Sequence, residues 1–93
     1  MPTLVAIDDE LEFTKTIDGF FSARGYTVHV ALTGTSGMEL VNYHRPDVVL
    51  VDLKLPGMDG DELLQRVRAS HPNIQVIVIT AYNDGGKTRD RLL

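Results

Sequence analysis

Three carboxylates in this sequence directly follow short apolar runs. Asp8 and Asp9 come after the run at residues 4–7, and Asp52 comes after the run at residues 48–51. Carboxylate oxygens are ligands that Mg2+ prefers, and a carboxylate can also attack phosphorus as a nucleophile. If the two runs are neighbouring strands, three negative charges converge, which raises at least one pKa unless a cation is bound. This grouping predicts metal-assisted phosphoryl transfer.

The elements that would position these carboxylates alternate between strands and helices. Apolar runs predict four strands, at residues 4–7, 26–32, 48–51 and 74–79. Most of these runs are apolar throughout rather than alternating, which is typical of strands buried on both faces. Alternating strands and helices predict a doubly wound, parallel α/β sheet, in which ligands bind beyond the carboxyl ends of the strands. Thr80, after the fourth strand, therefore joins the candidate site.

Helices are predicted in the intervals between these strands. The first starts near residue 11 and carries one apolar stripe, formed by Phe13, Ile17, Phe20 and Phe21. Gly25 is suited to close it as a C-cap. The later helices are predicted at about 36–43, after a possible cap at Asp59, and from residue 85 onward. Taken alone, Asp9 could equally be the cap of the first helix.

Composition limits the classes of function. The chain has 93 residues, a net charge of −4 and no cysteine, which predicts one small domain in a reducing compartment. An acidic balance argues against a direct nucleic-acid-binding surface, since phosphate backbones need clustered Lys and Arg. The N-terminus shows no basic leader and no apolar segment long enough for a membrane span. A cytoplasmic location is the resulting expectation.

Three segments, LVAIDDE, PDVVLVDLKLPGMDGDELL and IQVIVITAY, resemble the receiver domain of two-component response regulators. The resemblance follows the whole chain in order. It implies a flavodoxin-like sheet of five parallel strands in the order 2-1-3-4-5. It also implies a partner, a sensor histidine kinase or phosphotransfer protein, that donates a phosphoryl group to an Asp at the end of the third strand. Such a domain is a signalling phosphoacceptor, with at most slow autodephosphorylation, and is not an enzyme in its own right.

The resemblance assigns roles around a Mg2+ cofactor by position. Asp52 would be the phosphoacceptor and a metal ligand. Asp9 would bind Mg2+ directly, Asp8 would help to hold it through water, and the backbone carbonyl of Lys54 would be a further ligand.

The resemblance also assigns the residues of a conformational switch. The hydroxyl of Thr80 would move to hydrogen-bond the phosphoryl group, small Ala81 would leave access to it, and the loop from Tyr82 would repack. Pro56 and Gly57 would shape the loop beside the site. This is a local electrostatic event with a change of surface as its consequence.

The sequence departs from the family pattern at its C-terminal end. The family continues into a fifth strand, which ends in a Lys that pairs with the phosphoryl group, and a fifth helix, and Lys87 does not match that position. Residues 1–93 are therefore expected to form a receiver domain that is incomplete at the C-terminus. An uncovered edge beside residues 74–79 predicts self-association by edge pairing.

Three alternatives remain open at this point. Residues 81–88 fit a relaxed phosphate-loop pattern, although such a loop normally follows the first strand. A haloacid-dehalogenase type of phosphatase would need a second Asp where Lys54 stands. A phosphorylation-silent module with the same fold is the third alternative. The segment TGTSG at 33–37 is suited to a helix entry rather than a phosphate nest. The three histidines, His29, His44 and His71, are in different predicted elements, so a zinc site is not expected.

Overall fold

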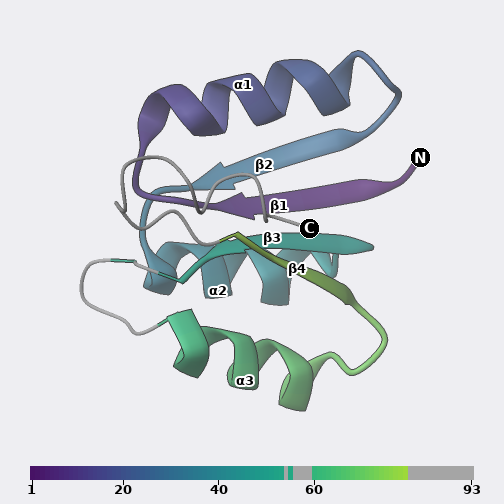
Figure 1. Cartoon of the computed structure of the whole chain (residues 1–93). Helices are drawn as coiled ribbons and strands as arrows, with labels where there is room; N and C mark the ends of the chain where they lie inside the picture. The colour runs from purple at the N-terminus through teal and green to yellow at the C-terminus, as the bar shows by residue number, and fades with distance from the viewer. Residues whose placement is uncertain (54, 56–59, 80–93) are drawn as a thin grey trace.

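The computed structural model describes residues 1–53, 55 and 60–79 of the chain. Within these residues, seven elements follow one another in strict alternation (Figure 1): β1 Thr3–Ile7, α1 Leu11–Ser22, β2 Thr27–Ala31, α2 Gly34–His44, β3 Val48–Asp52, α3 Gly60–Ser70 and β4 Gln75–Ile79. The four predicted strands are all present, with ends that differ by one residue at most. The helix predicted from residue 85 lies outside the described residues. None of the described helices has the length and apolar character of a membrane span.

The four strands form one parallel sheet in the order β2-β1-β3-β4. Helix α1 covers one face, and α2 and α3 cover the other (Figure 1). The predicted doubly wound α/β fold and the order of its first four strands are confirmed. The register pairs Ile7 of β1 with Val51 of β3, so the residues that follow these two strands emerge at the same edge of the sheet.

Both faces of the sheet are buried, which explains the continuous apolar runs of the inner strands. Beneath α2 and α3, the largest core cluster joins the inner strands to these two helices: Val5, Ile7, Val49 and Val51 of the sheet pack with Val41, Leu63 and Val67. On the α1 face, Leu4, Ala6 and Leu50 pack with Ile17 and Phe21. A central strand with both faces covered has few alternative registers, because a one-residue slip would exchange its two cores.

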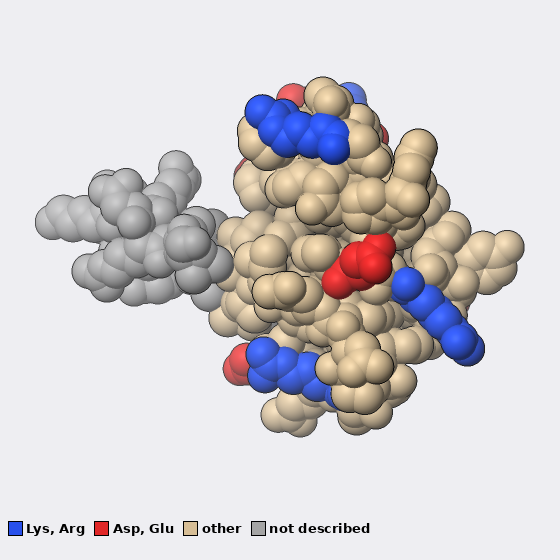
Figure 2. All heavy atoms as spheres, turned by 90° about the vertical axis from the view of Figure 1, so that its right-hand side faces the viewer, with Lys and Arg blue, Asp and Glu red and all other residues tan. Residues whose placement is uncertain are grey.

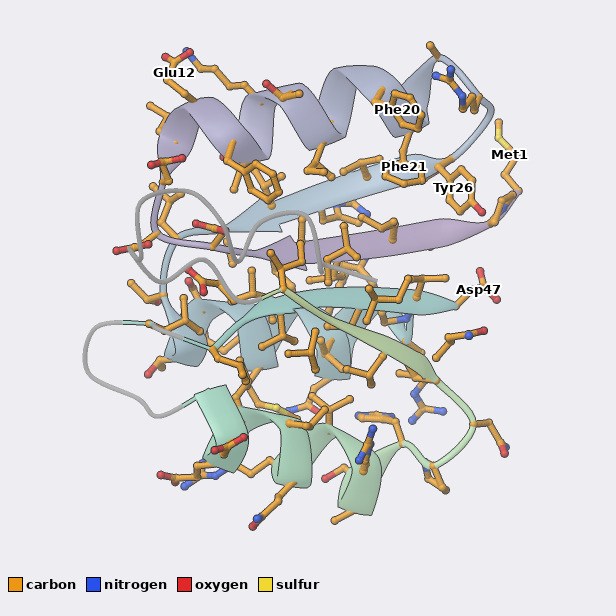
Figure 3. The ribbon with its side chains drawn as sticks, viewed as in Figure 1. Met1, Glu12, Phe20, Phe21, Tyr26 and Asp47 are labelled. Carbon is orange, nitrogen blue, oxygen red and sulfur yellow. The ribbon has the colours of Figure 1, made fainter. Side chains whose placement is uncertain are left out.

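The apolar stripe predicted for α1 is wrong at one position. Phe20 is 49% exposed, and the guanidinium of Arg24 lies 3.6 Å from the centre of its ring. Phe20 lies near the C-terminal end of α1 (Figure 3), where the helix reaches the margin of the sheet. The polar residue Thr14 is instead fully buried, with its hydroxyl donating to the carbonyl of Leu11.

Gly25 closes α1, as predicted. Its φ is +93°, the left-handed conformation that glycine adopts without a steric penalty. The N–H of Gly25 donates to Ser22, and the N–H of Tyr26 donates to Phe21. This pair of hydrogen bonds is a Schellman motif, and its usual apolar contact is made by the rings of Phe21 and Tyr26, 5.2 Å apart.

The helix entry predicted at TGTSG is confirmed. Thr33 is the N-cap of α2, and its hydroxyl accepts a hydrogen bond from the N–H of Ser36. Gly37, one turn further, lies directly against Ile7 of β1. A Cβ placed on Gly37 would be only 2.5–2.9 Å from three carbons of the Ile7 side chain. The close approach of α2 to β1 therefore requires glycine at this position.

Asp47 ties the amino ends of three strands together. Its N–H donates to the carbonyl of Thr3, its carboxylate accepts from the N–H of Thr3, and its carbonyl accepts from Gln75. Asp47 lies at the amino edge of the sheet (Figure 3), the face that Figure 2 presents to the viewer. The charged side chains visible on that face are scattered, and they form no continuous basic surface.

Candidate functional site

The carboxylates of Asp8, Asp9 and Asp52 converge at the carboxyl edge of the sheet. Each residue offers one oxygen, and these three oxygens all lie within 4.8 Å of one another. Asp8 directly follows β1, and Asp52 is the last residue of the neighbouring strand β3. Asp8 and Asp52 are 9% and 8% exposed, whereas Asp9 is open to solvent. The predicted convergence of the three acids is confirmed.

Backbone hydrogen bonds fix the position of Asp8. Its N–H donates to the carbonyl of Ala31 at 3.0 Å, which extends the pairing of β1 with β2 by one residue. Its Oδ1 accepts from the N–H of Glu10 at 2.9 Å, so one carboxylate oxygen is held in place. Glu10 is the N-cap of α1 and makes no side-chain cap hydrogen bond. The alternative role of Asp9 as a helix cap is therefore wrong, because the chain turns into α1 one residue later.

The site is electrostatically unfavourable for Asp8 without a cation. The pKa of Asp8 is raised to about 6, mainly by burial and to a smaller extent by the negative charges of Asp52, Asp9 and Glu10. The hydrogen bond from the N–H of Glu10 only partly opposes this rise. A cation bound among these carboxylates would reverse the effect, since an opposite charge at short distance favours the ionised form.

The donor set fits a hard divalent cation. All three ligand atoms are carboxylate oxygens, and the group combines two buried acids with one solvent-facing acid. Mg2+ binds one or two carboxylates and retains several waters. An exposed side leaves room for those waters or for a phosphate oxygen. Within the described residues, this is the single group of three or more potential metal ligands.

The raised pKa of Asp8 predicts how stability depends on pH when divalent cations are chelated. The pKa is about 6 in the folded chain, against 3.8 as its ordinary value, so between these values the folded state binds more protons than the unfolded state. The Asp8 carboxyl therefore contributes to the free energy of unfolding in its protonated form. This contribution is fully present below the unfolded pKa and is lost as the pH rises through the folded pKa. The contribution is roughly 3 kcal/mol at most.

Urea unfolding in EDTA at about pH 4.5 and about pH 7.5 measures this contribution. Other carboxylates also titrate over this range, so the comparison is made with Asp8→Asn, which removes only the group in question. The free energy of unfolding of the wild type should fall more steeply with pH than that of the variant. Equal slopes would mean that the Asp8 carboxyl has an ordinary pKa.

The other predicted site residues lie outside the described residues: Lys54, Pro56, Gly57, Thr80, Ala81 and Tyr82. The phosphate-loop pattern at 81–88 and the cap at Asp59 also lie there. The last described residue, Ile79, is paired with Asp52 in the sheet register. The N–H of Leu53 also donates to the carbonyl of Ile79 at 3.2 Å. Thr80 therefore follows, in the sequence, a residue that lies beside Asp52.

One pair of candidate side chains escaped the sequence analysis. The rings of His29 in β2 and His44 in the last turn of α2 are stacked, with centroids 3.7 Å apart and planes 11° from parallel. Burial and the neighbouring His44 lower the pKa of His29. Two histidines 15 positions apart give no local signal. Only the packing of α2 against β2 brings them together.

The fold and the site together define a class, the doubly wound parallel α/β domains with an acidic ion-binding group at the carboxyl edge of the sheet. A family model described as the response regulator receiver domain matches residues 4–92. The chain belongs to this family. Receiver domains are the phosphoacceptors of two-component signalling, and they bind Mg2+ at a cluster of aspartates such as the one formed here.

Individual relatives agree with this assignment. The chain is 37% identical over 81 residues to sporulation initiation phosphotransferase F of Bacillus subtilis, covering 87% of this chain and 65% of that protein. It is 33% identical to the transcriptional regulatory protein AfsQ1 of Streptomyces coelicolor, covering 90% of this chain and 37% of that protein. A receiver domain structure from Clostridium thermocellum superposes with a TM-score of 0.83 at 27% identity, covering 90% of this chain and 68% of that chain. The chain thus spans less than two thirds of the length of the Bacillus subtilis and Streptomyces coelicolor relatives.

Proposed function

We propose that this chain receives a phosphoryl group on Asp52 in a two-component phosphorelay. The observation that carries the proposal is the convergence of three carboxylate oxygens within 4.8 Å at the carboxyl edge of the sheet. Asp52 ends the central strand β3 and is largely buried. An oxygen of Asp52 would attack the phosphorus, the bond between phosphorus and the donor would break, and the donor would leave with the electron pair.

Asp9 and Asp8 would hold Mg2+ beside Asp52, with the backbone carbonyl of Lys54 as a further ligand. Asp9 is the solvent-facing member of the group and would bind the ion directly. Asp8, with one oxygen already held by the N–H of Glu10, would act through water. When bound, Mg2+ would screen the charge of the carboxylates and of the incoming phosphoryl group.

Thr80 would report the phosphorylated state. In the sequence it follows Ile79, which is paired with Asp52, and its hydroxyl would act from beside the acceptor. A phosphoryl group adds a charge of roughly −1.5 to −2 and three acceptor oxygens. Thr80 would donate to one of them, next to small Ala81, and the loop from Tyr82 would change its packing. Pro56 and Gly57 would shape the loop that follows Asp52.

The phosphoryl donor would be a sensor histidine kinase or a phosphotransfer protein. This proposal is supported by the family and by a relative whose own name is phosphotransferase. Residues 1–93 would act as a receiver domain in the cytoplasm and not as an enzyme in its own right. Direct nucleic-acid binding is not proposed, in keeping with the net charge of −4 and the scattered basic side chains of the face shown in Figure 2.

Self-association through the edge of β4 belongs to the same proposal. Among the described residues, β4 pairs only with β3. The side chains of residues 76–79 are only partly buried, and an apolar strand edge is a template for pairing with another chain. Light-scattering chromatography at tens of micromolar is the measurement. A single sharp monomer peak would contradict this part of the proposal.

The function itself is tested with beryllofluoride, which mimics a phosphoryl group bound to an aspartate. The protein is labelled with 15N, and NMR spectra are recorded with Mg2+ alone and with Mg2+ plus beryllofluoride. When beryllofluoride is added to the protein in Mg2+, we expect the amide signals of Asp52, Leu53 and Thr80 to shift. Signals that do not move would identify a phosphorylation-silent module with the receiver fold. Binding of Mg-ATP in the absence of any such shift would favour the phosphate-loop alternative.

Removal of one metal ligand gives a separate prediction. Asp9→Ala should abolish the dependence of acetyl phosphate labelling on Mg2+ and lower the labelling rate by at least about 100-fold, because a ligand of the ion is lost. The variant should fold normally, since Asp9 is exposed and Glu10, not Asp9, is the N-cap of α1. The measurement is the rate of mass increase as Mg2+ is titrated. Asp18→Ala, which removes a carboxylate from α1, is the matched control and should titrate like the wild type.

A further inference from the structure

Strand β2 forms one edge of the sheet, and among the described residues it pairs only with β1. Thr27 donates its N–H to Pro2 at 2.8 Å, and Ala31 accepts from Asp8 at 3.0 Å, so both residues turn their backbone groups toward β1. Backbone groups alternate in direction along a strand. Val28 and Val30 therefore direct their N–H and C=O groups away from β1, along the outer edge.

This edge lacks the features that usually prevent pairing. Thr27–Ala31 contains no proline and no Asp, Glu, Lys or Arg, and its register with β1 is continuous, without a bulge. Proteins generally protect an edge strand with a charge, a proline or a bulge. Val30 is 38% exposed, and Leu32, just beyond the strand, is 40% exposed. The edge thus presents apolar side chains together with outward backbone donors and acceptors.

We infer that β2 pairs in antiparallel fashion with β2 of a second copy of this chain, around a two-fold axis at His29. His29 is the middle of the five residues of the strand. With the axis there, Val28 lies opposite Val30 of the partner subunit, and Val30 lies opposite the partner's Val28. These are the residues whose backbone groups point outward, so each pair exchanges two hydrogen bonds, as in a hydrogen-bonded pair of an antiparallel ladder.

The side chains are compatible with this register. Val28 packs against the cluster of Leu4 and Ala6 on the α1 face, and Val30, two residues on, is on the same face. Each valine would therefore lie beside a valine of the other copy, a favourable cross-strand pair. His29 faces α2, where its ring is stacked on His44. The stack holds the imidazole against its own helix.

The pairing would produce a closed dimer, because each β2 edge is consumed by its partner. Only short strands meet, so the dimer is weak and transient, of the kind with a small interface. Pairing through β2 differs from self-association through β4 in the strand whose amides become protected from hydrogen exchange. The two modes together would give open chains of molecules rather than a dimer.

The first test is made on the wild-type chain at about pH 8, where unperturbed imidazoles are neutral. Sedimentation is measured from about 20 µM to about 1,000 µM, and amide hydrogen exchange is followed by NMR at both ends of the range. We expect self-association that increases with concentration, and slower exchange at Val28 and Val30 at high concentration, with His29 unchanged. A monomer throughout would overturn the inference. A dimer that protects Val76 and Val78 instead would also overturn it.

The second test places a charge on the edge. Val30→Lys should raise the dissociation constant of the dimer at least about tenfold, since lysine on an edge strand opposes pairing. Ala69→Lys adds the same charge on α3. This helix connects β3 to β4, at the other end of the sheet from β2, so the variant should leave the dissociation constant unchanged. Circular dichroism at low concentration checks that both variants fold. Unaltered dimerisation of a folded Val30→Lys protein would exclude the β2 interface.

Discussion

Asp52→Asn is expected to abolish phosphoryl transfer to this chain. The amide has nearly the same shape as the carboxylate but is not a nucleophile, so the rate of labelling by acetyl phosphate should fall by at least about 100-fold. The measurement is intact-protein mass spectrometry over time in Mg2+, followed by peptide mapping of the labelled site. The wild type should carry a single phosphoryl group on the peptide that contains Asp52.

The control for this variant is Asp47→Asn. Both substitutions exchange one carboxylate for an amide. Asp52 is the last residue of β3, whereas Asp47 precedes its first residue and lies at the amino edge, where its carboxylate accepts from the N–H of Thr3. Labelling of Asp47→Asn should match the wild type. Without Mg2+, Asp52→Asn should relieve part of the repulsion that raises the pKa of Asp8. Labelling that persists in Asp52→Asn would remove the central assignment.

Gly37→Val is expected to have the largest effect on stability. The new Cβ would lie 2.5–2.9 Å from three carbons of Ile7, a side chain that is fully buried between α2 and the sheet. Contacts this short cannot persist, so Ile7 or α2 must shift within a closely packed core. Overpacking of this kind costs roughly 1–3 kcal/mol, a large share of the stability of a small domain. Urea unfolding in Mg2+ is the measurement.

Gly19→Ala is the matched control and should have the opposite sign. Gly19 is within α1, and a Cβ at that position has no atom within 4 Å. Alanine should therefore stabilise the chain by about 0.5–1 kcal/mol through helix propensity alone. If Gly37→Val were as stable as the wild type, the close contact between α2 and β1 would not exist in solution. Because Ile7 immediately precedes Asp8, Gly37→Val should also weaken Mg2+ binding.

Much of the site could be predicted because it follows from topology. In a parallel sheet the carboxyl ends of neighbouring strands share one edge, so an apolar run that ends in Asp is enough to place Asp8 and Asp52 near each other. The burial of both sheet faces followed from the same apolar runs, whereas the strand order followed from the resemblance to receiver domains. The glycine closure of α1 and the helix entry at Thr33 followed from residue chemistry that is local in the sequence.

The features that could not be predicted depend on distances between elements. Phe20 fits the apolar period of α1, but the helix extends to the margin of the sheet, where no core remains to receive the ring. The stack of His29 on His44 depends on how α2 crosses the edge strand. The pKa of Asp8 is raised mainly by burial, and the sequence alone did not indicate which of the three acids would be most affected.

The arrangement around Asp47 also affects how the sheet could respond to chemistry at the other end. Three strands are joined there through the backbone and side chain of Asp47, and none of these hydrogen bonds involves Asp8, Asp9 or Asp52. That end of the sheet can serve as a stationary base while the opposite rim rearranges. A conformational change at the carboxyl edge would then be transmitted through the loops and helix ends at that edge, and not along the strands to the amino edge.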